Sequence, residues 1–187
     1  KYSNKKGMNF LDTAVAYENA ETKLGKIGLK KWKIISKISS ISAKSNNENI
    51  DKWIINSVEK SLDKLKVKSL YAVLIHNPKD LLGKQGKRIL KSLQQLKKMN
   101  YVNKIGISTY GDDFLNEIIP HTPIDLVQTS FNVLDQRLKK NGWLKKIKQL
   151  DIELHIRSVF LQGLLLMKKE DRPSLFVKWN NFWKKWD

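Results

Sequence analysis

Polar side chains follow one short apolar run after another along this chain, each close to the point where the run ends. The residues are Asp12, Lys37, His76, Ser108, Gln128 and Arg157. In barrel enzymes the catalytic groups come from the carboxyl ends of several different strands, which meet at one mouth. This pattern therefore predicts a site that is assembled from groups far apart in the sequence.

The elements that must position these groups alternate regularly. Runs rich in Ile, Val, Leu and Phe predict strands over residues 8–11, 33–36, 70–75, 102–107, 124–127 and 152–159. The stretches between them carry apolar residues at three- and four-residue steps, as at Ile50, Ile54 and Val58, which is typical of helices. Strict alternation of strand and helix indicates βαβ units and a parallel sheet. A last apolar stripe, typical of core or of a docking surface, comprises Trp179, Phe182, Trp183 and Trp186.

Two architectures contain such units, an open doubly wound sheet and a closed (β/α)8 barrel. A dinucleotide-binding open sheet has a glycine-rich turn after its first strand, and the pair Gly83 and Gly86 lacks its spacing and its third glycine. The polar strand ends favour the barrel. We expect residues 1–187 to form a single partial barrel domain without a linker, with 39–49 as the most loop-like segment.

Composition limits the classes of function. The formal net charge of +18 would suit a nucleic-acid partner, but lysines scattered over every helical segment supply most of it. The arginines that bidentate base contacts use number only four, so we expect no nucleic-acid partner. The chain has no cysteine, no predicted metal site and no apolar run of the roughly 18 residues that a membrane helix needs. We expect a cytoplasmic enzyme.

Several motifs resemble those of the aldo-keto reductase family, in the family's order and spacing. The opening run at 7–14 reads Gly-Met-Asn-Phe-Leu-Asp-Thr-Ala and precedes Tyr17, Ala20-Glu21 and Leu24-Gly25. Later matches are Leu-Ile-His-Asn-Pro at 74–78, Ile-Gly-Ile-Ser at 105–108, Val-Gln at 127–128 and Gln-Gly-Leu-Leu at 162–165. The resemblance covers essentially the whole chain. It implies reduction of an aldehyde or ketone with a nicotinamide cofactor.

The resemblance also implies a catalytic tetrad of Asp12, Tyr17, Lys37 and His76. In the family the tyrosine gives its proton to the carbonyl oxygen as hydride reaches the carbon. An isolated tyrosine releases its proton only near pH 10, and a neighbouring ammonium favours the phenolate form. Lys37 would supply that ammonium, a buried Asp12 carboxylate would orient it, and His76 would donate a hydrogen bond to the developing oxyanion.

For the cofactor, the resemblance implies Ser108 and Gln128 as hydrogen-bond partners of the nicotinamide carboxamide. Thr109 stands where the family often has asparagine, which leaves one amide contact in doubt. Arg157 occupies the position of an aromatic that stacks on the nicotinamide ring, and a guanidinium plane can also stack on a flat ring. Asn132 and residues 135–137 are candidates for the rim of the site, with turn capping as the equal alternative.

A closed barrel has eight strands, and about six are predicted here. Residues 1–6 resemble the tail of a first helix, and the chain stops before the family's eighth strand. We therefore expect a barrel that lacks its first and last strands, from a longer natural protein. In the family the eighth strand carries the adenosine-side contacts that distinguish NADP from NAD, so the resemblance here implies NADP with NAD as the open alternative. A non-catalytic reductase-like binding subunit remains the alternative function.

Overall fold

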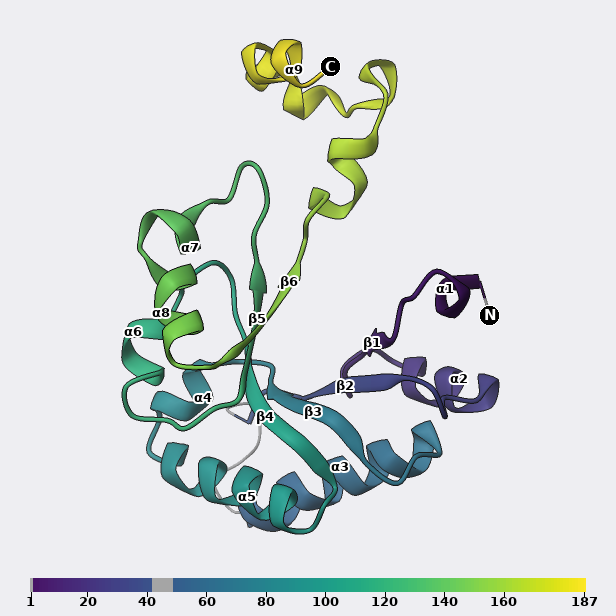
Figure 1. The fold of residues 1–187 in the computed structure, drawn as a ribbon, viewed down its shortest axis with the longest axis vertical. Coiled ribbons are helices and arrows are strands. Elements are labelled where there is room, and N and C mark those ends of the chain that lie inside the picture. The colour runs from purple at the N-terminus through teal and green to yellow at the C-terminus, as the bar shows by residue number, and fades with distance from the viewer. Residues whose placement is uncertain (1, 42–48) are drawn as a thin grey trace.

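Six parallel strands form one sheet in the order of the chain, so each strand pairs with its sequence neighbours. The computed structural model describes residues 2–41 and 49–187. Its strands are β1 (Phe10–Asp12), β2 (Lys33–Ile38), β3 (Leu70–Ile75), β4 (Val102–Ser108), β5 (Leu126–Ser130) and β6 (Glu153–Arg157). Figure 1 shows this sheet curling like half of a barrel. The predicted incomplete (β/α)8 barrel is confirmed, because an open doubly wound sheet would reverse its strand order.

Helices follow the strands and cover the outer face of the sheet. The two longest, α3 (Ile50–Leu65) and α5 (Gly86–Lys98), lie side by side against β2, β3 and β4 (Figure 1). Ile54 and Leu93 are fully buried there between helix and sheet. The other helical segments are α1 (Tyr2–Lys5), α2 (Ala20–Ile27), α4 (Lys79–Leu82), α6 (Leu115–Ile118), α7 (Arg137–Lys140), α8 (Trp143–Gln149), η1 (Leu161–Leu166), η2 (Lys169–Asp171), η3 (Ser174–Trp179) and α9 (Asn180–Trp186).

Five of the six predicted strands differ from the observed ones by one to three residues at an end, and only the strand at 70–75 matches; β2 and β4 each run on beyond their predicted ends, to Ile38 and Ser108. Residues 8–9 precede β1, because pairing with β2 begins only at Phe10 opposite Lys33. β5 begins at Leu126 and extends to Ser130, whose pairing with Arg157 continues it beyond the apolar run. β6 ends at Arg157, since Ser158 adopts a left-handed backbone (φ 59°) that a strand cannot continue. Of the predicted loop at 39–49, residues 42–48 lie outside the described part of the chain.

Side chains of strands that do not pair with one another meet across the inner face, which demonstrates its curvature. Tyr71 of β3 donates a hydrogen bond of 2.5 Å to Glu153 of β6, and Lys104 of β4 pairs with the same carboxylate. His155 contacts the other oxygen of Glu153 at 2.6 Å. Burial alone would raise the pKa of Glu153, but the hydrogen bonds from Lys104, Tyr71 and His155 outweigh it and lower the pKa to about 2. A charged layer thus fills the amino end of the half-barrel, where branched apolar side chains are usual.

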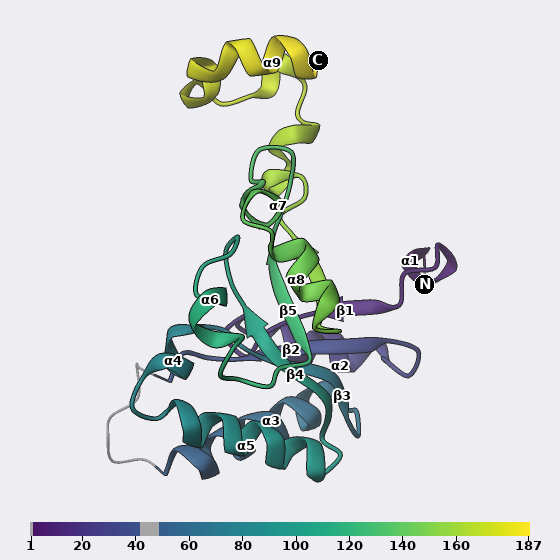
Figure 2. The same ribbon diagram turned by 60° about the vertical axis from the view of Figure 1, so that its left-hand side comes forward.

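The segment after β6 lies apart from the strands in both views (Figures 1 and 2). It has a small core of its own, formed by Leu164, Leu165 and Trp183. Of the predicted aromatic stripe, Trp183 is buried while Trp179 and Trp186 are largely exposed. No helix in residues 2–41 and 49–187 combines the length and the apolar character needed to cross a bilayer.

Gly106 of β4 lies where the backbone of β5 approaches too closely for a side chain. A Cβ atom at this position would lie 1.9 Å from the carbonyl oxygen of Leu126. Gly106 and Leu126 are register partners, so the carbonyl could retreat only by disturbing the pairing of β4 with β5. These two strands carry Ser108 and Gln128, which pair with each other in the ladder, and a shift between the strands would move both side chains.

We predict that Gly106→Ala lowers the melting temperature by about 3–10 °C, because overpacking against a rigid backbone costs about 1–3 kcal/mol. Gly83→Ala is the matched control, since a Cβ there lies 3.7 Å from its nearest neighbour and the backbone is not left-handed. Thermal unfolding of both variants followed by circular dichroism measures the difference. Equal melting temperatures for the two variants would contradict the close approach.

Candidate active site

Lys37 lies at the centre of the carboxyl end of the half-barrel. The alternation of β2 directs Ile35 and Lys37 to the inner face, and Lys37 is 1% exposed. Its Nζ donates to Asp12 Oδ2 at 2.7 Å and to the backbone oxygen of Thr13 at 2.9 Å. An ammonium buried to this degree is stable only with such partners. The predicted lysine is therefore tied directly to the end of β1.

Asp12 is more exposed than predicted. Its side chain is 44% exposed, so the expectation of a buried carboxylate was wrong, and the lysine is the buried member of the pair. The reason lies in the topology: β1 has three residues and pairs only with β2 among the described strands. Asp12 is thus the last residue of a short edge strand. One carboxylate oxygen faces Lys37 and the other accepts from Gln128.

Tyr17 and His76 complete the group of four. Tyr17 lies on the turn after β1, with its ring centroid 5.1 Å from Lys37 Nζ, and it is 44% exposed. His76 directly follows β3, and its ring meets that of Tyr17 edge-on at a centroid distance of 6.0 Å. Burial, together with the positive charges of Lys37 and Arg157, lowers the pKa of His76. The imidazole is therefore neutral at neutral pH. The structure brings all four predicted tetrad residues together.

Ser108 and Gln128 are buried beside this group; Ser108 ends β4 and pairs with Gln128, the middle residue of β5. Ser108 Oγ donates to Gln128 Oε1 at 3.2 Å, and Gln128 Nε2 donates to Asp12 Oδ1 at 2.8 Å. A hydroxyl and a primary amide that face the same mouth are the donor and acceptor types that a nicotinamide carboxamide pairs with. The residues present therefore fit that group.

Arg157 has partners that the sequence did not predict. Its Nη2 donates to the backbone oxygen of Thr109 at 2.7 Å, and its guanidinium carbon lies 4.1 Å from the ring centroid of Tyr110. The Thr109 side chain does not take part in this contact: its hydroxyl donates to the Asp113 backbone oxygen within the loop after β4. Tyr110 was missed because nothing in the sequence around it marks a contact with a strand 47 positions away.

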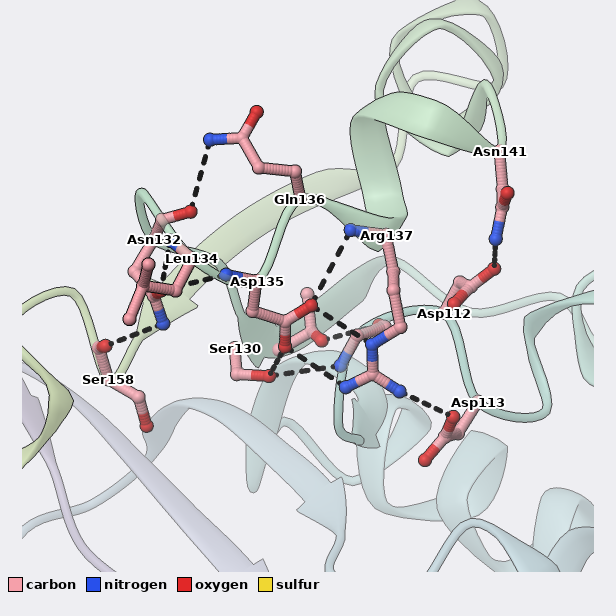
Figure 3. A network of polar contacts seen from close by, with 12 residues as sticks. Asp112, Asp113, Ser130, Asn132, Leu134, Asp135, Gln136, Arg137, Asn141 and Ser158 are labelled. Atoms are coloured by element: carbon pink, nitrogen blue, oxygen red, sulfur yellow. Dashed lines mark hydrogen bonds and ion pairs between the residues drawn. The ribbon is translucent and has the colours of Figure 1, made fainter. Parts of the chain in front are cut away.

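The loop after β5 is held by a polar network (Figure 3). Asn132 Oδ1 accepts from the backbone nitrogens of Leu134 and Asp135 at 2.9 Å each, so the turn-capping alternative describes this residue. Asn132 Nδ2 also donates to the backbone oxygen of Ser158, directly after Arg157. Arg137 joins Asp135 to Asp113 in the loop after β4, and its hydrogen bond lowers the pKa of Asp135. The network thus fixes both loops that flank Arg157.

Comparison with known proteins places the chain in a family. The model of the aldo/keto reductase family matches residues 1–185. The chain belongs to the aldo/keto reductase family. This membership agrees with the motifs and with the half-barrel described above.

Among residues 2–41 and 49–187 no group of three acidic, cysteine or histidine side chains is placed to hold a metal ion.

Individual relatives are distant and longer. The uncharacterized oxidoreductase YqkF of Bacillus subtilis (strain 168) is 24% identical over 190 residues, which cover 94% of this chain and 59% of that protein. The aldo-keto reductase AKR11C1 from Bacillus halodurans in its holo form has a TM-score of 0.75 at 19% identity, with 92% of this chain and 59% of that chain covered. An aldo/keto reductase from Klebsiella pneumoniae, solved in complex with NADP and acetate, has a TM-score of 0.69 at 17% identity, with 88% and 59% covered. The chain therefore spans about 59% of the length of these relatives.

The buried pair of Lys37 and Asp12 leads to a stability prediction. Asp12→Ala leaves the Lys37 ammonium buried with only the Thr13 carbonyl, and we expect a loss of about 1–3 kcal/mol, below the usual 3–5 because Asp12 is partly solvated. Adding Lys37→Met should recover part of this loss. Asp113→Ala is the matched control, because its 48% exposed carboxylate faces a 45% exposed guanidinium of Arg137 and should cost less than about 1 kcal/mol. Urea unfolding measures all four proteins.

A double variant less stable than Asp12→Ala would show that the unpaired ammonium is not the source of the loss.

Proposed function

We propose that this protein is an oxidoreductase that transfers hydride from NADPH, or alternatively NADH, to an aldehyde or ketone, with Tyr17 as the proton donor. The observation that carries the proposal is the buried Lys37 ammonium between the Asp12 carboxylate and the Tyr17 ring, with His76 against the same ring. The substrate is thus a small carbonyl compound. Membership of the aldo/keto reductase family supports the proposal.

Tyr17 is the one tetrad member able to deliver a proton from an accessible position. Its side chain is about half exposed, while Lys37 behind it is buried. When the hydroxyl proton leaves for the carbonyl oxygen, the ammonium 5.1 Å from the ring stabilises the phenolate that remains. Asp12 acts as a positioning residue, because it touches Lys37 and Gln128 and holds the ammonium in place.

His76 has a different part in the proposal. Its lowered pKa keeps the imidazole neutral near pH 7, so it does not compete with Tyr17 as an acid. A neutral imidazole still donates one hydrogen bond, and a donor aimed at the carbonyl oxygen stabilises the negative charge that develops there. Its edge-on contact with Tyr17 supports a role for both groups at the same carbonyl oxygen.

The cofactor, when bound, supplies the hydride. Ser108 and Gln128 would hold its carboxamide, since both are buried at the mouth and linked to each other by a hydrogen bond. Arg157, at the end of β6, would lie beside the nicotinamide, as the family resemblance implies. The likeness in fold to an aldo/keto reductase solved with NADP supports the use of a nicotinamide cofactor.

We predict that Tyr17→Phe lowers the rate of aldehyde reduction about 10²–10⁴-fold, because general acid catalysis contributes that much. The affinity for NADPH should stay within about two-fold, since the hydroxyl is not a cofactor contact in the proposal. Steady-state reduction of 4-nitrobenzaldehyde and fluorescence titration with NADPH measure the two effects. Tyr101→Phe is the matched control, because its hydroxyl contacts Glu59 on the outer face, and its rate should equal that of the wild type.

A Tyr17→Phe protein that reduces the aldehyde within a few-fold of the wild-type rate would remove Tyr17 as the acid. Wild-type protein that binds NADPH and reduces no aldehyde or ketone would instead favour the non-catalytic binding subunit.

A further inference from the structure

Arg157 differs from the other arginines of this chain in having no acidic partner. The chain contains four arginines, and three of them pair with carboxylates: Arg88 with Asp51, Arg137 with Asp113 and Asp135, and Arg172 with Asp187. Within the described residues, Arg157 pairs with no carboxylate. A positive charge is thus left uncompensated at the mouth where the tetrad lies.

The guanidinium of Arg157 is nevertheless fixed in position. The Thr109 backbone oxygen holds Nη2, and the Tyr110 ring supports the guanidinium plane. Nε is buried and has no hydrogen-bond partner in the described part of the chain. A planar, preorganised guanidinium with free donors is the group that recognises carboxylates and phosphates in two-point contacts. The geometry therefore points to an anionic ligand.

The surroundings of Arg157 direct that ligand toward the reacting carbonyl. Arg157 is the last residue of β6 and pairs with Ser130 of β5. It lies two residues beyond His155, which pairs with Gln128, so its side chain is on the same face of the sheet as that of His155. Arg157 Nη2 donates to the backbone oxygen of Thr109, which directly follows the buried Ser108 at the mouth. The Asn132 amide holds the backbone immediately after it (Figure 3). Lys37 is already paired with Asp12, whereas Arg157 has no acidic partner among the described residues.

We propose that Arg157 binds an anionic group of the carbonyl substrate, either a carboxylate or a phosphate, and thereby makes acidic carbonyl compounds the preferred substrates. This inference rests on the proposed reductase function. Tyr17 and His76 hold the carbonyl oxygen, and Arg157 holds the acidic end of the same molecule. The net charge of +18 adds a long-range attraction for such anions. Phosphates of the cofactor could meet the same guanidinium, and the experiment separates the two sources.

The test compares matched acidic and neutral substrates. One pair is 4-formylbenzoate and its methyl ester, and the other is glyceraldehyde 3-phosphate and glyceraldehyde. We expect wild-type kcat/KM to favour the acidic member of at least one pair about 10- to 100-fold, the usual worth of a hydrogen bond to a charged group. Arg157→Met should abolish that preference, read as the ratio of kcat/KM for the acidic member to kcat/KM for the neutral member, because a changed contact with the nicotinamide would affect both members alike and cancel in the ratio.

Two further variants serve as controls. Arg157→Lys keeps the charge without the planar fork, and we expect it to retain part of the preference. Arg88→Met removes an arginine that already pairs with Asp51 on the surface and should leave the preference unchanged. Melting temperatures of all variants show whether a loss reflects folding, and Arg157→Lys carries the test if Arg157→Met does not fold.

Two outcomes would overturn the proposal. Wild-type protein without preference for either acidic substrate would remove the anion site. A preference for the acidic member that survives in Arg157→Met, with acidic and neutral substrates slowed alike, would leave Arg157 with a cofactor contact alone. If no aldehyde is turned over, saturation-transfer NMR measures the binding of 4-formylbenzoate and of its methyl ester. Selective binding of 4-formylbenzoate that is lost in Arg157→Met would support the anion site and contradict the reductase function. Binding without selectivity would contradict both.

Discussion

Burial of the Lys37 ammonium is the constraint on which the rest of the site depends. Transferring an ammonium from water into a protein costs several kcal/mol unless hydrogen bonds and an opposite charge compensate it. Here the compensation comes from Asp12 Oδ2 and the Thr13 backbone oxygen, both at the end of β1. The parallel register of β1 with β2 therefore has to hold for the lysine to be tolerated. The same register sets the start of the turn that carries Tyr17.

The curvature of the sheet extends this constraint across the half-barrel. Asp12 belongs to β1 and Gln128 to β5, with three strands between them, yet their side chains are 2.8 Å apart. A flat sheet could not bring them together. At the other end, Glu153 gathers Tyr71, Lys104 and His155 from three strands into one charged layer. Polar contacts at both ends thus span the inner face, and Ile35, Ala72, Leu74 and Leu126 pack between them.

The sequence predicted the parts of this structure that local pattern determines. Apolar runs predicted six strands, and polar residues near the ends of these runs predicted the mouth. This prediction succeeds because the carboxyl ends of all strands in a parallel sheet lie at the same edge. Contacts between residues far apart in the sequence could not be predicted from local pattern. The exposure of Asp12 follows from β1 being a short edge strand, and the support of Arg157 by Tyr110 follows from the loop after β4 reaching the end of β6. Neither depends on the residues next to it in the chain.

The claim that Lys37 acts through Tyr17 is tested most directly by a double-mutant cycle. Single-turnover hydride transfer to 4-nitrobenzaldehyde would be measured for wild type, Tyr17→Phe, Lys37→Met and the double variant, at saturating NADPH. Because Lys37 has no separate route to the carbonyl, the double variant should be no more than about three-fold slower than the slower single variant. A double variant slowed by the product of the two single effects would show that Lys37 and Tyr17 act independently, and would contradict the account.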